Sequence, residues 1–189
     1  YQIVIKVNYA PGSMKVRLII NVMKKVLLLT FFAIAQQGIA QQYLTREATL
    51  SFDAGSQLED IYAVSESASA VYDATDGKLG VQVLMSSFRF KRALMQEHFN
   101  ENYVESEKFP KAQFTGTYEG GQAVGQLSIH GLTKDIAVPC EILEADGELL
   151  LQTEFPVTIE DFGVSIPGAV SNKIAKEAKV TVRAALKKR

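Results

Sequence analysis

Residues 87–116 read SFRFKRALMQEHFNENYVESEKFPKAQFTG and join one predicted β-strand to the next through one amphipathic helix, expected at about 91–104. Met95, Phe99 and Tyr103 recur at four-residue spacing with Leu94 beside them, so they share one face of a helix. The helix must end before Phe109-Pro110, because a proline pushes the preceding residue out of the helical region. Since nearly every other segment after residue 40 favours strand or turn, we expect this single helix to plug or cap a β-structure.

Apolar and polar residues alternate from Leu44 onward, as they do in strands with one buried face. Residues 61–64 and 68–72 predict two weaker strands, and residues 136–142 predict a clear one. Turn signals separate the strands at Asp76-Gly77, Gly120-Gly121 and Asp146-Gly147. About eight short strands, each polar on one face, predict an all-β antiparallel barrel or sandwich.

The inward-facing positions mix large and small apolar side chains. Phe52, Phe114 and Phe155 are large, whereas Ala112, Gly125 and several other inward residues are small. About eight strands is the size at which a closed barrel can hold one small ligand, and the mixture leaves room for a narrow apolar cavity. Ordinary packing of a tapering barrel uses the same mixture. The residues alone therefore leave a hollow and a filled interior open.

The first 40 residues are expected to lie outside the folded domain, which we place at 41–189. Residues 23–40 combine a basic start, an apolar run and small residues near Ala40, the pattern of a secretory signal peptide. The apolar run, residues 26–35, is shorter than the about 20 residues that span a bilayer, so a retained membrane anchor is the weaker alternative. Residues 1–22 are interpreted as upstream sequence before a start at Met23, with an authentic short extension as the alternative. We therefore expect a periplasmic or secreted protein without a stable membrane anchor.

The charge of residues 41–189 argues against nucleic acid as a partner. Residues 1–40 hold five of the 20 basic residues and none of the 21 acidic ones, which leaves 15 basic and 21 acidic residues and a net charge of −6. An acidic domain without a basic cluster is repelled by phosphate backbones.

No residue pattern indicates catalysis, a cofactor or a metal site. The single Cys140 excludes an internal disulfide and is interpreted as a small apolar residue of the interior. His98 lies beside Glu97, but no nucleophile or substrate group can be assigned to it. A polar contact to a hairpin or to a ligand head group is the better interpretation. His130 is expected to tie the Gly131 turn to neighbouring backbone, and neither histidine has further residues at metal-ligand spacing.

Three stretches together resemble the YceI-like family of exported bacterial proteins. The first holds Ser87-Phe88, His98-Phe99, Lys108-Phe109-Pro110 and Phe114; the others hold His130-Gly131-Leu132-Thr133 and Asp161-Phe162-Gly163. The resemblance covers about residue 77 to the C-terminus. Residues 95–99, MQEHF, depart from the charged step that is usual in the family, which indicates a divergent branch.

The resemblance implies a lipocalin-like barrel that binds a polyisoprenoid or similar lipid without catalysing a reaction. An apolar chain offers no hydrogen bonds, so its affinity must come from apolar area removed from water. The expected partner is thus an apolar small molecule; the oligomeric state stays open, with a homodimer as one option. The residues expected to line the site are Leu84, Phe88, Phe90, Leu94, Phe99, Phe114, Leu127, Ile129 and Phe155. An interaction module with a filled barrel, acting through its surface, is the alternative.

Overall fold

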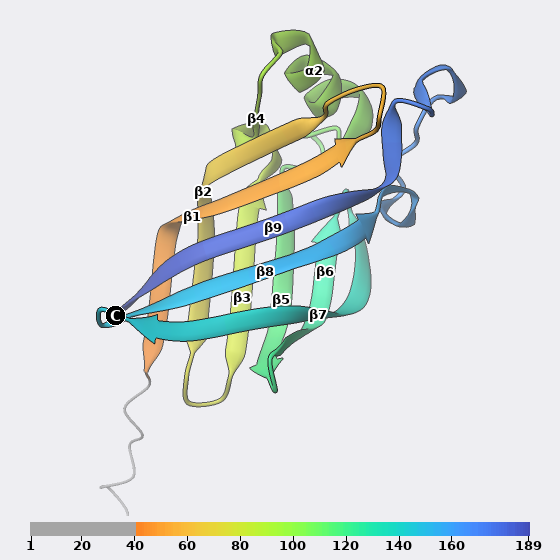
Figure 1. Cartoon of the computed structure of the whole chain (residues 1–189). Coiled ribbons are helices and arrows are strands. Elements are labelled where there is room, and N and C mark those ends of the chain that lie inside the picture. The colour runs from red at the N-terminus through yellow and green to blue at the C-terminus, as the bar shows by residue number, and fades with distance from the viewer. Residues whose placement is uncertain (1–40) are drawn as a thin grey trace, which may run out of the picture. The chain divides into compact units, whose positions relative to one another are not determined.

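Alternating apolar and polar residues form long antiparallel strands in the part of the chain that the computed structural model describes, residues 41–189 (Figure 1). In the last strand, Ala178, Val182 and Leu186 are buried, whereas Lys179 and Arg183 between them are exposed. The predicted upstream segment (1–22) and signal peptide (23–40) lie outside the described residues.

The described chain contains nine strands, one α-helix, one π-helical segment and three 3₁₀ turns. In order these are β1 (Gln42–Gly55), β2 (Tyr62–Asp73), β3 (Lys78–Leu84), η1 (Met85–Ser87), β4 (Arg89–Phe90), α2 (Ala93–His98), η2 (Phe99–Tyr103), β5 (Lys111–Glu119), β6 (Gln122–Ile129), β7 (Leu132–Ala145), β8 (Glu148–Thr158), η3 (Ile159–Phe162), η4 (Gly168–Val170) and β9 (Ile174–Lys188).

The strands form a closed barrel. They pair in the order β1-β9-β8-β7-β6-β5-β3-β2, and β1 pairs with β2 to complete the ring. Every pairing is antiparallel, and β4 adds only two residues to β2. The predicted all-β, lipocalin-like barrel of about eight strands is confirmed, and the described strands do not form the alternative sandwich.

The two strands predicted at 61–64 and 68–72 are wrong, because they are parts of the single strand β2. The polar residues 65–67 separate the two apolar segments in the sequence. Ser65 is nevertheless buried, and its hydroxyl oxygen lies 2.7 Å from that of Ser87. A buried hydroxyl with a hydrogen-bond partner is tolerated inside a strand. Shifts of register in β1 between Thr45 and Leu50 accommodate the bend of this long strand.

Strand β7 changes neighbours along its length. Residues 132–139 pair with β6, and residues 140–145 pair with β8. Pro139, which has no N–H to donate to a ladder, lies at the change, and its carbonyl accepts a 2.6 Å hydrogen bond from Thr153 Oγ1. The prediction of a strand at 136–142 recognised only the middle of β7, because the pairing partners outside that segment leave no mark in its own sequence.

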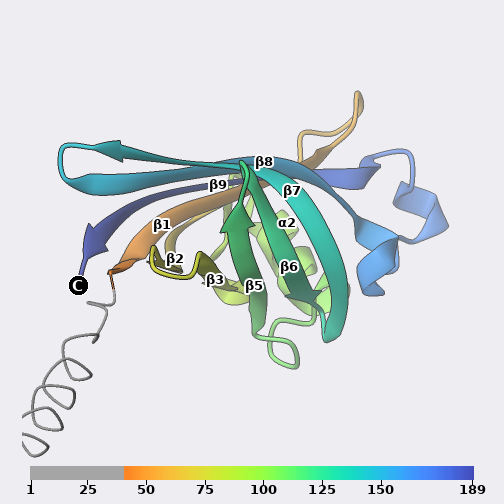
Figure 2. The same cartoon turned by 90° about the horizontal axis from the view of Figure 1, so that it is seen from below.

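The predicted helix is present but shorter and less regular than expected. It consists of α2 followed by the π-helical η2, where the Val104 N–H donates to the Phe99 carbonyl over 3.0 Å. The Asn100 side chain donates to the carbonyl of Gln96 at the junction, over 2.8 Å. Figures 1 and 2 together place α2 over one end of the barrel. The expectation that the helix caps the β-structure therefore agrees with the fold.

Candidate ligand-binding cavity

The barrel encloses an apolar cavity of about 500 Å³. This volume lies within the range of small-molecule sites, which are typically concave and mostly apolar. Seven barrel strands contribute to its wall, with Leu50, Val81, Phe114, Leu127, Ile136, Leu151 and Val182 as representatives. The inward residues therefore do not fill the barrel, which favours the hollow interior over the filled one.

Eight of the nine residues that the sequence placed in the site line this cavity: Phe88, Phe90, Leu94, Phe99, Phe114, Leu127, Ile129 and Phe155. Their contact with a ligand stays a prediction. Leu84 is wrong as a lining residue, because it is 45% exposed and lies outside the cavity. Its neighbours Val83 and Met85 are buried and line the cavity, so the alternation of the strand directs Leu84 outward.

Four phenylalanines line the helix end of the cavity. Phe52 of β1 packs edge-on against Phe88, with ring centroids 5.1 Å apart, and stacks on Phe99 at 5.4 Å. The ring centroids of Phe90 and Phe99 lie 5.1 Å apart. Because aromatic pairs at such separations stabilise beyond their buried area, this cluster fixes η2 to the barrel. Met95 and Tyr103, predicted on the same helix face, also line the cavity.

Two facing glycines make room for Phe114 on the opposite wall. Gly116 of β5 pairs directly with Gly125 of β6. A Cβ on Gly116 would lie 2.8 Å from the ring of Phe114, and one on Gly125 would lie 2.4 Å from the carbonyl oxygen of Thr115. The ring of Phe114 thus lies against bare backbone.

Charged residues gather where the loops meet the cavity. Glu59 follows β1, Arg92 precedes α2 and Lys173 precedes β9, and all three line the cavity. The Arg92 guanidinium donates to the Glu59 carboxylate, and this bond, with the positive charges of Arg92 and Lys173, lowers the pKa of Glu59 below its ordinary 4.5. Sequence reasoning missed this group because its members lie far apart in the chain and show no shared pattern.

The histidines have different surroundings. His130 is held by the carbonyl of Phe162 at Nδ1 and by the Glu105 carboxylate at Nε2, both at 3.1 Å, with Phe109 packed edge-on at 4.5 Å. It therefore ties its turn to neighbouring backbone, as predicted. His98 is exposed and lines the cavity, and its ring makes no hydrogen bond to any residue within 41–189.

Cys140 lines the cavity from β7 and is 2% exposed. Burial raises the pKa of its thiol to about 11. The thiolate is the reactive form of cysteine, so this residue behaves as an apolar wall residue, as predicted.

Within residues 41–189, no three His, Cys, Asp or Glu side chains are placed to hold a metal ion. None of the helices in this range is long and apolar enough to cross a membrane.

Fold and cavity together define a lipocalin-like antiparallel barrel with an internal apolar site. The chain belongs to the YceI-like family, since the model of the YceI-like domain matches residues 45–186. No curated protein matches the sequence significantly.

Solved structures share the fold at low identity. A polyisoprenoid binding domain from Saccharophagus degradans, implicated in plant cell wall breakdown, is 11% identical with a TM-score of 0.67, over 79% of this chain and 99% of that one. BcnA of Burkholderia cenocepacia is 14% identical with a TM-score of 0.63, over 74% and 95%. The YceI protein of Campylobacter jejuni is 21% identical with a TM-score of 0.53, over 65% and 83%.

Proposed function

We propose that this protein binds an isoprenoid or similar lipid inside its barrel, in the periplasm or outside the cell, without catalysing a reaction. The observation that supports this most is the mostly apolar wall around a cavity of about 500 Å³. The similar domain from Saccharophagus degradans is described as polyisoprenoid-binding. Export is proposed from the signal-peptide pattern at residues 23–40.

Burial of an apolar chain supplies enough free energy for such a function. Each methylene removed from water contributes about 0.8 kcal/mol, so about ten buried methylenes supply about 8 kcal/mol before the cost of immobilising the ligand. The dissociation constant follows from what remains of this gross value after that cost, so a longer buried chain binds more tightly. No placed charge is needed along the chain-binding wall.

The residues around the cavity support binding rather than chemistry. His98 is the one histidine that lines it, and no hydroxyl or carboxylate within residues 41–189 makes a hydrogen bond to that ring. General acid–base catalysis requires a partner or substrate group within hydrogen-bond reach. Cys140, the other candidate, holds its proton because its pKa is about 11.

Displacement of an environment-sensitive apolar dye by farnesol tests the proposal on the full chain expressed in a bacterium. Phe114→Trp enlarges a wall residue that is 8% exposed, and we expect it to weaken farnesol binding several-fold in a folded protein. Leu150→Trp is the matched control, because Leu150 faces outward and is 44% exposed. Equal binding by both variants would remove Phe114 from the site, and no displacement by farnesol or by the longer isoprenoid alcohols in wild type would contradict the proposal.

A second candidate function acts through the outer surface. Leu143 and Leu150 pair directly across the β7–β8 hairpin and are 62% and 44% exposed, an apolar contact surface on the outside of the barrel. An interaction module in envelope maintenance would use such a surface and bind no lipid. Loss of partner capture in Leu143→Ser, with lipid binding absent in the wild type, would favour this candidate.

A further inference from the structure

We propose that the mouth of the cavity selects a ligand with one anionic head group, such as a carboxylate, held by Arg92 and Lys173. This inference rests on the proposed function, because it specifies the head of the molecule whose chain occupies the barrel. It concerns a different part of the cavity from the apolar wall and can fail separately.

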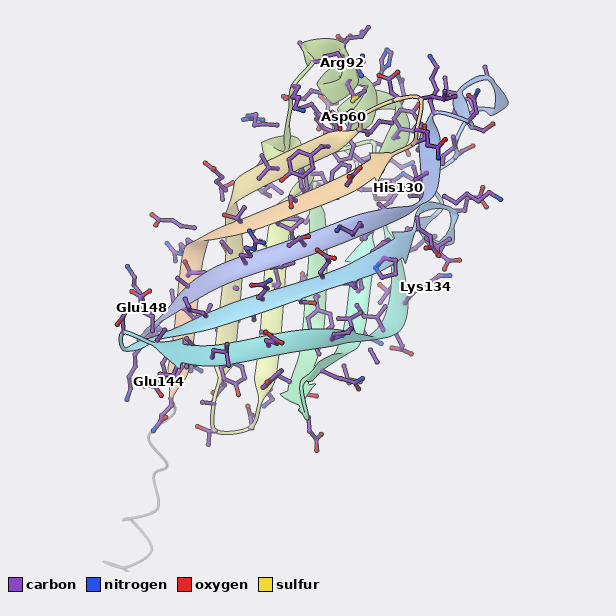
Figure 3. All side chains as sticks on the ribbon, in the orientation of Figure 1. Asp60, Arg92, His130, Lys134, Glu144 and Glu148 are labelled. Carbon is purple, nitrogen blue, oxygen red and sulfur yellow. The ribbon has the colours of Figure 1, made fainter. Side chains whose placement is uncertain are left out.

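Three separate loops bring the polar residues to the mouth. Glu59 comes from the connection between β1 and β2, Arg92 from the residues before α2, and Lys173 from the residues before β9. Figure 3 shows Arg92 at the helix end of the barrel, with Asp60, the neighbour of Glu59, nearby. A head group at this end is adjacent to the four phenylalanines, so an apolar chain attached to it enters the barrel directly.

The residues at the mouth carry one more positive charge than negative charge. Glu59 is the only acidic residue that lines the cavity, whereas Arg92 and Lys173 are both cationic. Arg92 is paired with Glu59, and Lys173 forms no salt bridge with any residue within 41–189. Lys173 is still close enough to Glu59 to contribute to the lowered pKa of that carboxyl group. One added anion would therefore neutralise the group and give Lys173 a partner.

The single excess positive charge at the mouth disfavours other head groups. A cationic head would be repelled by the excess positive charge, and a neutral head would leave Lys173 without a partner. A head with two or more negative charges would exceed the available positive charge and meet the Glu59 carboxylate. Charge-assisted hydrogen bonds from Arg and Lys to a carboxylate are stronger than those to neutral groups.

The cavity also limits how much of the chain is enclosed. Its volume of about 500 Å³ lies within the range of small-molecule sites, so the barrel encloses a chain of moderate length. A chain of sixteen carbons is thus a suitable common chain for comparing head groups.

Displacement of the same apolar dye from the full chain at pH 8 compares hexadecanoate, hexadecanol, hexadecylammonium and hexadecyl phosphate. We expect hexadecanoate to bind about tenfold more tightly than hexadecanol, as one charge-assisted hydrogen bond at a partly exposed site would give. Hexadecylammonium should bind more weakly than hexadecanol, and hexadecyl phosphate no more tightly than hexadecanoate. The preference for hexadecanoate over hexadecanol should decrease at high salt, because salt screens the charges of the exposed mouth.

Two variants of the existing ion pair give opposite results if the proposal is correct. Arg92→Gln should remove most of the preference for hexadecanoate, whereas Glu59→Gln should increase it by freeing Arg92. If the Arg92–Glu59 ion pair only stabilised the fold, both variants would change the binding of hexadecanoate in the same direction. Lys91→Gln is the matched control, because Lys91 pairs with Asp60 at 2.9 Å beside this group and does not line the cavity.

Equal binding of hexadecanoate and hexadecanol by the wild type would overturn the inference while leaving the proposed function intact. Much tighter binding of hexadecyl phosphate than of hexadecanoate would also overturn it. The same holds if Arg92→Gln and Lys173→Gln leave the preference for hexadecanoate over hexadecanol unchanged. Failure of all four ligands to displace the dye would instead count against the proposed function itself.

Discussion

Phe52 of β1 and Phe99 of η2 stack with their ring centroids 5.4 Å apart, and this contact joins the helical segment to the barrel beneath it. Phe99 also meets Phe88 at 5.8 Å and Phe90 at 5.1 Å. Phe99 thus joins the helical segment to the barrel and is itself part of the cavity wall.

Replacement of Phe99 by alanine should therefore loosen the cap of the barrel. We expect Phe99→Ala to lower the free energy of unfolding by about 2–3 kcal/mol, because the ring is only partly buried and the fully buried case costs 3–5 kcal/mol. Urea denaturation followed by circular dichroism measures this change. Leu94→Ala is the control: this side chain is 62% exposed on the same helix and should change stability by less than about 0.5 kcal/mol. Equal losses in the two variants would contradict the role of the aromatic cluster.

Gly125→Ala should destabilise the barrel by about 2–3 kcal/mol. The new Cβ would lie 2.5 Å from the Cα of Gly116 and 2.4 Å from the carbonyl oxygen of Thr115, and both atoms belong to backbone that cannot rotate away. Gly168→Ala is the matched control, since nothing lies within 4 Å of that position. It should be neutral or slightly stabilising, because alanine restricts the unfolded chain. A stable Gly125→Ala protein in thermal unfolding would contradict the close approach of β5 and β6.

His130→Ala should lower the free energy of unfolding by about 2 kcal/mol, because it removes the ring that lies between the Phe162 carbonyl and the Glu105 carboxylate and packs edge-on against Phe109. His98→Ala removes the only other histidine, which is exposed, and should leave stability unchanged within about 0.5 kcal/mol. Chemical denaturation of the two variants side by side makes the comparison. The reverse order of the two effects would contradict the assigned contacts.

The Cys140 thiol should react slowly with iodoacetamide at pH 8 in the folded protein and rapidly after unfolding in urea. Its pKa is about 11 in the fold and about 9 when exposed, so little thiolate is present at pH 8. The folded state retains the thiol proton more strongly than the unfolded state does. The free energy of unfolding therefore includes the full contribution of the protonated Cys140 below pH 9. It should decrease as the pH rises from about 9 to about 11. Mass spectrometry of the labelled protein measures the rate, and equally fast labelling in both states would contradict the buried placement.

The sequence predicted those features that repeat along the chain or act between near neighbours. Period-two alternation identified inward residues such as Ala112 and Phe114 of β5, and the spacing of Met95, Phe99 and Tyr103 identified the helix face that meets the cavity. The error at Leu84 arises because its apolar character suggests an inward side chain, whereas Val83 before it in β3 and Met85 after it are the buried residues.

Features that depend on distant partners could not be predicted. Ser65 looked like an interruption because its partner, Ser87, belongs to another element. The pairing of Arg92 with Glu59, and the approach of Lys173, require three loops to meet at one end of a closed barrel. Neither the local composition nor the spacing of these residues indicates that meeting.

Native mass spectrometry of the protein purified from a bacterial periplasm, followed by organic extraction, shows whether the barrel carries a lipid. The full chain is expressed so that any processing of its first 40 residues occurs naturally. We expect a discrete additional mass that extracts as a long-chain lipid and is reduced in Phe114→Trp. A protein that carries no added mass, and that stays unliganded after incubation with isoprenoid alcohols and hexadecanoate, would contradict it.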